Sequence, residues 1–170
     1  KGFGVSAPTI TTGTGVTNIG ITNATLNGEL TAGGGADIYV YYGTFDGGTT
    51  NNAWSYTNIL GTLSQQVFAA TNGGLTQGQL YYYRTYATNA AGYDWANAAV
   101  WFIPGIKFMK VDAAGANDGS SWANAYTTMT NALKYCPSGW EIWAAASTNT
   151  PGPAVGDTFT VTNNVIYGGF

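Results

Sequence analysis

Short runs of alternating apolar and polar residues fill the first part of the chain, and clusters of Gly and Asn separate them. Ile38 and Val40, for example, fall on one face of a strand and Tyr39 on the other, because successive side chains of a strand point to opposite sides. No helical period occurs in this part. The pattern predicts an antiparallel β-sandwich of immunoglobulin-like size. Its predicted strands span residues 9–12, 24–30, 37–42, 56–60, 66–71, 80–89 and 98–103.

The pattern changes after Pro104. Behind a polar loop, apolar residues recur at helical spacing, with Ser121 or Asn124 as N-cap and Pro137 as the stop, which predicts one amphipathic helix. The apolar stripe of this helix consists of Trp122, Ala125, Tyr126, Met129, Ala132, Leu133 and Cys136. The other elements expected here are a strand at 107–112, the loop at 113–120, and strands at 141–145, 158–162 and 165–167.

Composition narrows the classes of function. The 170 residues are 45% hydrophobic, enough to bury a core, and only 8% are charged. Five Lys and Arg stand against eight Asp and Glu, so the basic surface that nucleic acid requires is missing. Since there is no His and the carboxylates are dispersed, we expect no enzyme and no catalytic or cofactor-binding residue. The apolar stretches are far shorter than the roughly 20 residues that span a bilayer, so no membrane span is expected.

The compartment is suggested by composition as well. A high content of Thr, Asn, Gly and Ala with few Lys and Glu is typical of secreted and surface bacterial proteins, so we expect an extracellular or cell-surface location. The chain opens with Lys1 and shows no basic and apolar leader, from which we expect that a signal peptide was removed or that the sequence is a fragment. Cys136 has no second cysteine to pair with and is expected to fill the core.

Residues 75–92, with the sequence LTQGQLYYYRTYATNAAG, resemble the last third of a bacterial fibronectin type III-like domain. In that family a leucine in a turn is followed by a tyrosine whose hydroxyl clamps the corner, and Leu75 and Tyr81 have the same spacing. Residues 38–48 also resemble a subfamily that is repeated in large surface proteins of environmental bacteria. The resemblance covers residues 8–103 and implies a spacer or adhesion module rather than a catalyst.

A motif Asp-Gly-Ser-Ser-Trp ends at Trp122, within residues 111–126. Together with residues 141–144 and 166–170, this segment resembles the entrance of bacterial right-handed parallel β-helices. In that family a helix covers the open end of the coil, and the strands after it begin the first rungs. The resemblance implies a structural role for Trp122.

The number of rungs bears on assembly. A parallel β-helix needs roughly three or more rungs to bury its core, and this sequence supplies about one. The last strand then offers unpaired backbone groups to another chain. We therefore expect neighbouring copies to cover it by strand addition or end-to-end stacking, with Val165, Tyr167 and Phe170 as candidate contacts. The alternative is a larger protein of which this sequence is a piece.

Several aromatic side chains of the sandwich are expected to point away from its core. If neighbouring strands bring them together, they form a patch of the kind that marks an interface. These candidate interface residues are Tyr39, Tyr41, Tyr82, Arg84 and Tyr86. Because aromatic faces also stack on sugars, copies of the same chain and an extracellular polysaccharide compete as partners for these residues.

Asp112, Asn117 and Asp118 are weak candidates for a calcium site, since Ca²⁺ takes six to eight hard oxygen ligands. The competing interpretation is an Asx turn with N-capping polar groups. No Glu stands where an EF-hand loop would need its bidentate ligand. No other metal or cofactor is expected.

The predicted fold is therefore mainly β. Residues 1–7 are expected to form an N-terminal extension or strand, residues 8–104 a fibronectin type III-like sandwich, and residues 105–170 one amphipathic helix with the first rung of a parallel β-helix. The expected function is that of a non-catalytic extracellular structural protein, a self-assembling subunit of a filament or surface layer. Two alternatives stay open: a carbohydrate-binding or adhesion fragment of a larger secreted surface protein, and a piece of a β-helical polysaccharide-degrading enzyme.

Overall fold

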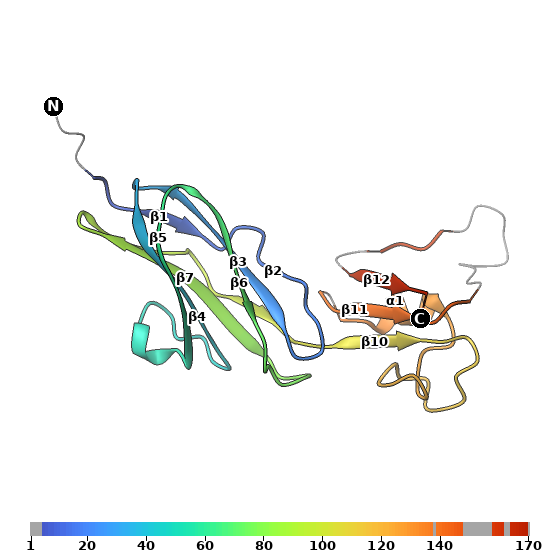
Figure 1. The fold of residues 1–170 in the computed structure, drawn as a ribbon. Coiled ribbons are helices and arrows are strands. Elements are labelled where there is room, and N and C mark those ends of the chain that lie inside the picture. Colours follow the sequence, from blue (N-terminus) through green and yellow to red (C-terminus); the bar gives the residue numbers. More distant parts are fainter. Residues whose placement is uncertain (1–4, 138, 148–157, 162–163, 170) are drawn as a thin grey trace. The chain divides into compact units, whose positions relative to one another are not determined.

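A computed structural model describes residues 5–137, 139–147, 158–161 and 164–169. The chain divides into two compact units, one of residues 1–18 with 22–103 and the other of residues 19–21 with 104–170. The first consists mainly of strands, and the described part of the second contains three short strands and one helix (Figure 1). The elements are β1 (Thr9–Thr11), β2 (Val16–Thr17), β3 (Ala24–Ala32), β4 (Ala36–Gly43), η1 (Asn51–Ala53), β5 (Tyr56–Leu63), β6 (Gln66–Asn72), β7 (Tyr81–Asn89), β8 (Gly92–Trp95), β9 (Val100–Phe102), β10 (Ile106–Met109), α1 (Met129–Tyr135), β11 (Glu141–Ala144) and β12 (Val165–Gly168). No helix among these is long and apolar enough to cross a membrane.

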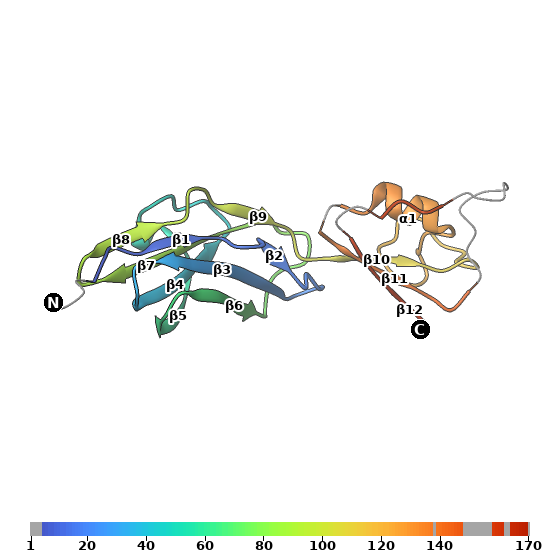
Figure 2. The same ribbon diagram turned by 90° about the horizontal axis from the view of Figure 1, so that it is seen from above.

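The first unit is a β-sandwich of two antiparallel sheets. In one sheet β3 pairs with β1, β2 and β6, and Figure 2 shows β3 and β6 side by side. In the other sheet the order is β5-β4-β7-β8, and β9 also pairs with β7. Apolar side chains from both sheets meet in one buried cluster, which includes Ile10 and Leu30 from the first sheet and Ile38 and Ala87 from the second. The alternation in the sequence placed Ile38 and Val40 on one face of their strand, and both are buried in the structure.

Two strands of the sandwich were not predicted. β8 has the sequence Gly-Tyr-Asp-Trp, and Gly and Asp are depleted in strands. The strand pairs with β7 just before it, and distant contacts hold it as well, since Asp94 Oδ2 accepts the N–H of Ile10 at 2.9 Å and Trp95 is buried. The other is β2, which has only two residues.

The corner before β7 is closed by Tyr81. Its hydroxyl oxygen accepts the N–H of Thr76 at 3.1 Å, and its ring stacks on Phe102 with the centroids 5.6 Å apart. Leu75 is buried next to this turn, and its N–H donates to the carbonyl of Thr22. The fibronectin type III resemblance implied a hydroxyl at this corner for Tyr81, and the bond from Thr76 is made there.

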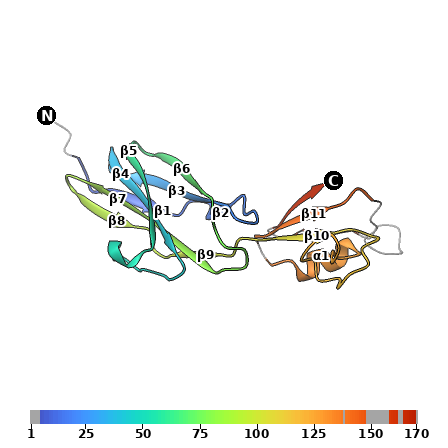
Figure 3. The ribbon, with the colours of Figure 1, turned by 60° about the horizontal axis from the view of Figure 1, so that its bottom comes forward.

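The second unit is built on a parallel sheet of β10, β11 and β12 (Figure 3). The three strands are in register, so that Lys107 lies opposite Ile142 and Ile142 opposite Ile166. One face of the sheet packs against α1 and the residues before it. This buried core contains Met109, Ile142 and Ala144 from the sheet, with Tyr126, Met129, Ala132 and Cys136.

The helix is shorter than the sequence predicted. It begins after Thr128, whose hydroxyl accepts the N–H of Asn131 at 3.2 Å, and not after Ser121 or Asn124. The earlier part of the apolar stripe has helical spacing, but Tyr126 bonds to the backbone of β10 instead. Residues 158–161 are also not a strand, contrary to the prediction for 158–162; residue 162 lies outside the described part.

Candidate functional site

The outer edge of β10 is covered by the chain itself. The N–H of Phe108 donates to the carbonyl of Gly119 at 3.0 Å, and the N–H of Lys110 donates to that of Tyr126 at 2.9 Å. In return, the N–H of Tyr126 donates to the carbonyl of Phe108 at 2.9 Å. We call residues 113–126 the edge cover. Because these bonds occupy the outward backbone groups of Phe108 and Lys110, this edge offers little to another strand.

Asn124 holds the edge cover in shape. Its carbonyl accepts the N–H groups of Asp118 at 3.0 Å and Gly119 at 2.8 Å, and its Oδ1 accepts the N–H of Ala116 at 3.0 Å. Trp122, in the same segment, packs its ring against Phe108 with the centroids 4.8 Å apart. The Asp-Gly-Ser-Ser-Trp motif therefore belongs to the cover of an edge and not to a helix.

The opposite edge of the parallel sheet belongs to β12. Among the described residues β12 pairs only with β11, and it contains no charged residue. The side chains of Val165 and Tyr167 are 53% and 42% exposed. Phe170, the third residue predicted for this surface, lies outside the described residues. Within the described part of the chain, the parallel sheet is thus protected on one edge and accessible on the other.

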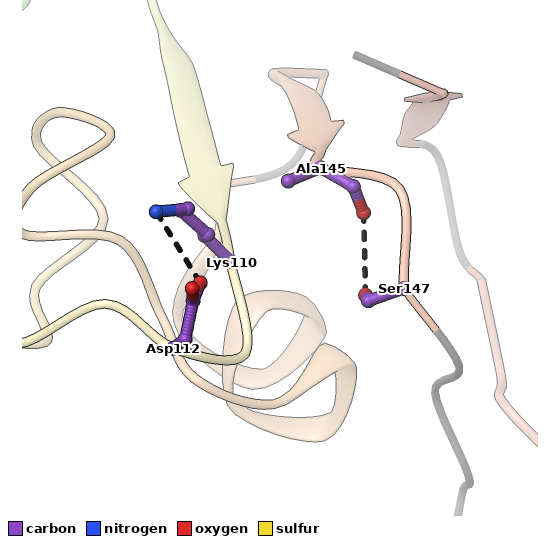
Figure 4. A network of polar contacts seen from close by, with 4 residues as sticks. All are labelled: Lys110, Asp112, Ala145 and Ser147. Atoms are coloured by element: carbon purple, nitrogen blue, oxygen red, sulfur yellow. Dashed lines mark hydrogen bonds and ion pairs between the residues drawn. The ribbon is translucent and has the colours of Figure 1, made fainter.

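The face of the parallel sheet turned away from α1 carries aromatic side chains in register. Phe108, Trp143 and Tyr167 stand opposite one another on successive strands, with 6.2 Å between the rings of Phe108 and Trp143. Beside them lies a cavity of about 340 Å³, lined by Lys110, Trp122, Trp143 and Ala145. Figure 4 shows the polar contacts of two of these residues: Lys110 pairs with Asp112 at 3.3 Å, and the hydroxyl of Ser147 donates to the carbonyl of Ala145.

The sandwich has two long edge strands of its own. β5 pairs only with β4 and β6 only with β3 among the described strands, and neither contains a charged residue or a proline. Ile59 on β5 and Val67 on β6 are each 72% exposed. The two edges differ in regularity. The β4–β5 pairing shifts register after Ile38, whereas the β3–β6 pairing runs unbroken from Ala24 to Leu30.

The aromatic residues predicted to gather on the sandwich do gather. The ring centroid of Tyr86 lies 5.8 Å from that of Tyr39 and 6.3 Å from that of Tyr41, and Tyr82 packs against the same cluster. Their predicted exposure is only partly present. Tyr41 is buried in a cluster with Trp54 and Trp95, and this burial raises the pKa of its hydroxyl.

Arg84 lies beside this cluster and is held in place by backbone. Its Nε donates to the carbonyl of Ala96 at 2.6 Å, and its Nη2 donates to that of Asn97 at 2.9 Å. The guanidinium carbon lies 6.0 Å from the ring centroid of Trp95. A cavity of about 360 Å³ opens here, lined by Thr49, Arg84, Tyr93, Asp94, Trp95 and Asn97. The sequence pointed to Arg84 but not to Tyr93 or Trp95, because the strand that carries them was missed.

The candidate calcium ligands have partners within the chain. Asp118 Oδ1 accepts the N–H of Ser120 at 2.9 Å, and hydrogen bonds to Ser120 hold the pKa of Asp118 below its usual range. Asn117 Oδ1 accepts the N–H of Thr127 at 2.9 Å, and Asp112 pairs with Lys110. No group of three or more His, Cys, Asp or Glu suited to a metal occurs in the described part of the chain. Calcium binding stays a prediction.

Comparison with known proteins adds similarity at the level of fold. No protein-family model and no curated protein sequence matches the chain. Among solved structures it is similar to the sensor domain of an anti-sigma factor of Pseudobacteroides cellulosolvens, with 18% identity over 59% of this chain and 96% of that domain, at a TM-score of 0.40. It is also similar to a computationally redesigned β-sandwich protein, with 21% identity over 60% of this chain and 97% of that one, at a TM-score of 0.39.

The chain is also similar to the sixth fibronectin type III domain of human fibronectin type III domain containing protein 3. The identity is 17% over 62% of this chain and 90% of that domain, at a TM-score of 0.35. The assignment of a β-sandwich to the first unit rests on the strand pairing described above.

Proposed function

We propose that this chain is a non-catalytic structural protein of the cell exterior that assembles with copies of itself through β-strand edges. One observation carries the proposal: the parallel sheet is covered at β10 by its own backbone, while no described residue covers it at β12. An unpaired edge of this kind is a template for another strand.

The partner edge on the next copy is β6. It is uncharged and its pairing with β3 is unbroken, whereas β5 is interrupted by a register shift of the kind that protects edges. The β12 edge and the β6 edge are different surfaces of one chain. A contact between two different surfaces repeats from copy to copy. It gives a filament unless the rotation that relates neighbouring copies closes them into a ring.

The charge of the chain supports close packing of copies. The formal net charge is only −3, so little self-repulsion opposes association. The composition that is typical of secreted proteins supports the extracellular location. The carbohydrate-degrading alternative needs two carboxylates across one groove, and each of the four cavities described for the chain is lined by at most one.

The test compares two edge variants with a matched control. Val165→Lys combined with Tyr167→Lys places charge on β12, and Val67→Lys places it on β6. Ile59→Lys is the control, because Ile59 is as exposed as Val67 but lies on the interrupted edge. Light scattering and electron microscopy should show filaments of the wild type and of the control, and single particles of both edge variants.

A mixture of the two edge variants sharpens the test. Each variant keeps one intact edge, so the mixture should form a one-to-one dimer and stop there. A wild-type chain that stays monomeric up to its solubility limit would overturn the proposal. Filaments of the β12 variant would overturn it as well.

A further inference from the structure

Arg84 is a cation without a described counter-ion. It makes no ion pair with a described carboxylate, although it is half-buried on β7. Two of its five N–H donors go to the carbonyls of Ala96 and Asn97, which fix the plane of the guanidinium without forming an ion pair. Partly buried charges are normally paired, because removing them from water is unfavourable. The arrangement is therefore suited to an anion from outside the chain.

The wall beside Arg84 is aromatic and rigid. The ring of Tyr93 is 68% exposed, yet it is supported from behind by Tyr86, at 5.9 Å between centroids. Tyr86 in turn packs on Trp95 at 4.8 Å. A ring that is exposed on one face and supported on the other can take a flat apolar ligand surface without being ordered first.

Polar groups complete the cavity. Thr49 and Asn97 line it and carry a hydroxyl and an amide, which both donate and accept hydrogen bonds. Asp94 also lines the cavity, and its carboxylate is held by the N–H of Ile10, which donates to Oδ2, so it forms no ion pair with Arg84. The volume of about 360 Å³ is in the range of small-ligand sites.

From these groups we infer that the cavity at Arg84 binds a carboxylated sugar, a uronate residue of an acidic polysaccharide. The guanidinium takes the carboxylate, for which its forked donors are suited. The exposed face of Tyr93 stacks on the apolar face of the sugar ring, and Thr49 and Asn97 meet its hydroxyls. This site lies in the sandwich and does not depend on assembly through β12.

The probe is a galacturonate oligosaccharide, and a neutral glucan oligosaccharide of equal length is the comparison. Calorimetry with the wild-type chain should detect the galacturonate and not the glucan, and binding should weaken as salt is added. Arg84→Met should lose roughly tenfold or more in affinity, Arg84→Lys should retain part of it, and Tyr93→Ser should lose several-fold.

Tyr56→Ser is the matched control, since Tyr56 is a comparably exposed tyrosine of the same unit outside the cavity. It should bind galacturonate as the wild type does. Thermal unfolding of each variant checks that the sandwich is intact, which matters because Arg84 also bonds to two carbonyls. The inference would be overturned if the wild type did not bind galacturonate, if the glucan bound equally well, or if folded Arg84→Met bound galacturonate as the wild type does. Equal competition by inorganic phosphate would overturn the assignment to a sugar.

Discussion

The hydroxyl of Tyr83 donates to the carbonyl oxygen of Asn27 across 2.9 Å and thereby joins the two sheets of the sandwich from inside. Tyr83 is fully buried on β7, and its hydroxyl also lies 3.1 Å from the carbonyl oxygen of Thr12. Burial raises the pKa of Tyr83, so the group remains a neutral donor over the whole physiological range. The two sheets are thus connected by a directed bond as well as by apolar packing.

Tyr83→Phe should destabilise the sandwich by about 1–2 kcal/mol, because it leaves a buried carbonyl without a donor and keeps the ring in place. Urea unfolding followed by tryptophan fluorescence measures the change. Tyr93→Phe, which removes an exposed hydroxyl, should leave the free energy of unfolding unchanged. Equal effects of the two substitutions would contradict the role given to the Tyr83–Asn27 bond.

Gly33→Ala should cost at least about 2 kcal/mol of folding free energy. Gly33 has a φ of +107°, and an added Cβ would lie 2.5 Å from Cα of Pro8, which is backbone and cannot rotate away. Gly73→Ala is the control, because its φ is ordinary and a Cβ there meets no atom within 4 Å. A melting temperature lowered equally by both substitutions would show that neither φ nor Pro8 matters at this turn.

Cys136 should react slowly with iodoacetamide at pH 8 in the native chain and rapidly in denaturant. Burial raises the pKa of its thiol from 9.0 to about 11, so the native thiolate is scarce. Between pH 9 and about 11 the thiol is ionised in the unfolded chain but still protonated in the native chain. Stability therefore falls as pH rises through this window, by on the order of 2 kcal/mol.

Cys136→Ala is the reference for that pH dependence. The two proteins differ only at this residue, so the difference between the two curves isolates the thiol. The curves should converge in stability as pH rises from 9 to 11, and parallel curves would contradict the raised pKa.

The sandwich could be predicted because one face of each strand is buried, which forces the alternation into the sequence. The predicted strands at 37–42 and 80–89 correspond closely to β4 and β7 for this reason. β8 could not be found in this way, since Asp94 and Trp95 hold it through distant contacts. The start of the helix was wrong for a related reason: the edge of β10 competes for the backbone of Tyr126.

The candidate sites depend on the same kind of long-range contact. Tyr41 was expected on an exposed patch, but Trp54, in the segment after β4, packs against it. No local pattern in the sequence predicts that this segment folds back onto the strand. Tyr93 and Trp95 lie on the strand that the sequence did not reveal, so the cavity at Arg84 became visible only in the fold. By contrast, the apolar run at 165–167 predicted a short strand after the helix, and the structure has β12 there.

Asn124→Ala should open the edge cover without unfolding the sheet. The substitution removes the Oδ1 acceptor of the Ala116 N–H and weakens the turn that presents Gly119 to β10. The amides of Phe108 and Lys110, which donate into the cover, should then exchange with deuterium at least tenfold faster, which corresponds to about 1.4 kcal/mol of local stability. Amides of the sandwich, such as that of Tyr83, should keep their protection.

Asp112→Asn is the control for this experiment, because Asp112 lies just before the edge cover and its side chain is largely exposed. It should leave the exchange of Phe108 and Lys110 unchanged.

If the cover is what confines strand addition to β12, then Asn124→Ala should also make β10 accessible, and its assemblies should become branched or amorphous in electron micrographs. Rapid exchange at Phe108 in the wild type would mean that the cover does not close the edge in solution, and a free β10 would then take part in assembly on equal terms with β12.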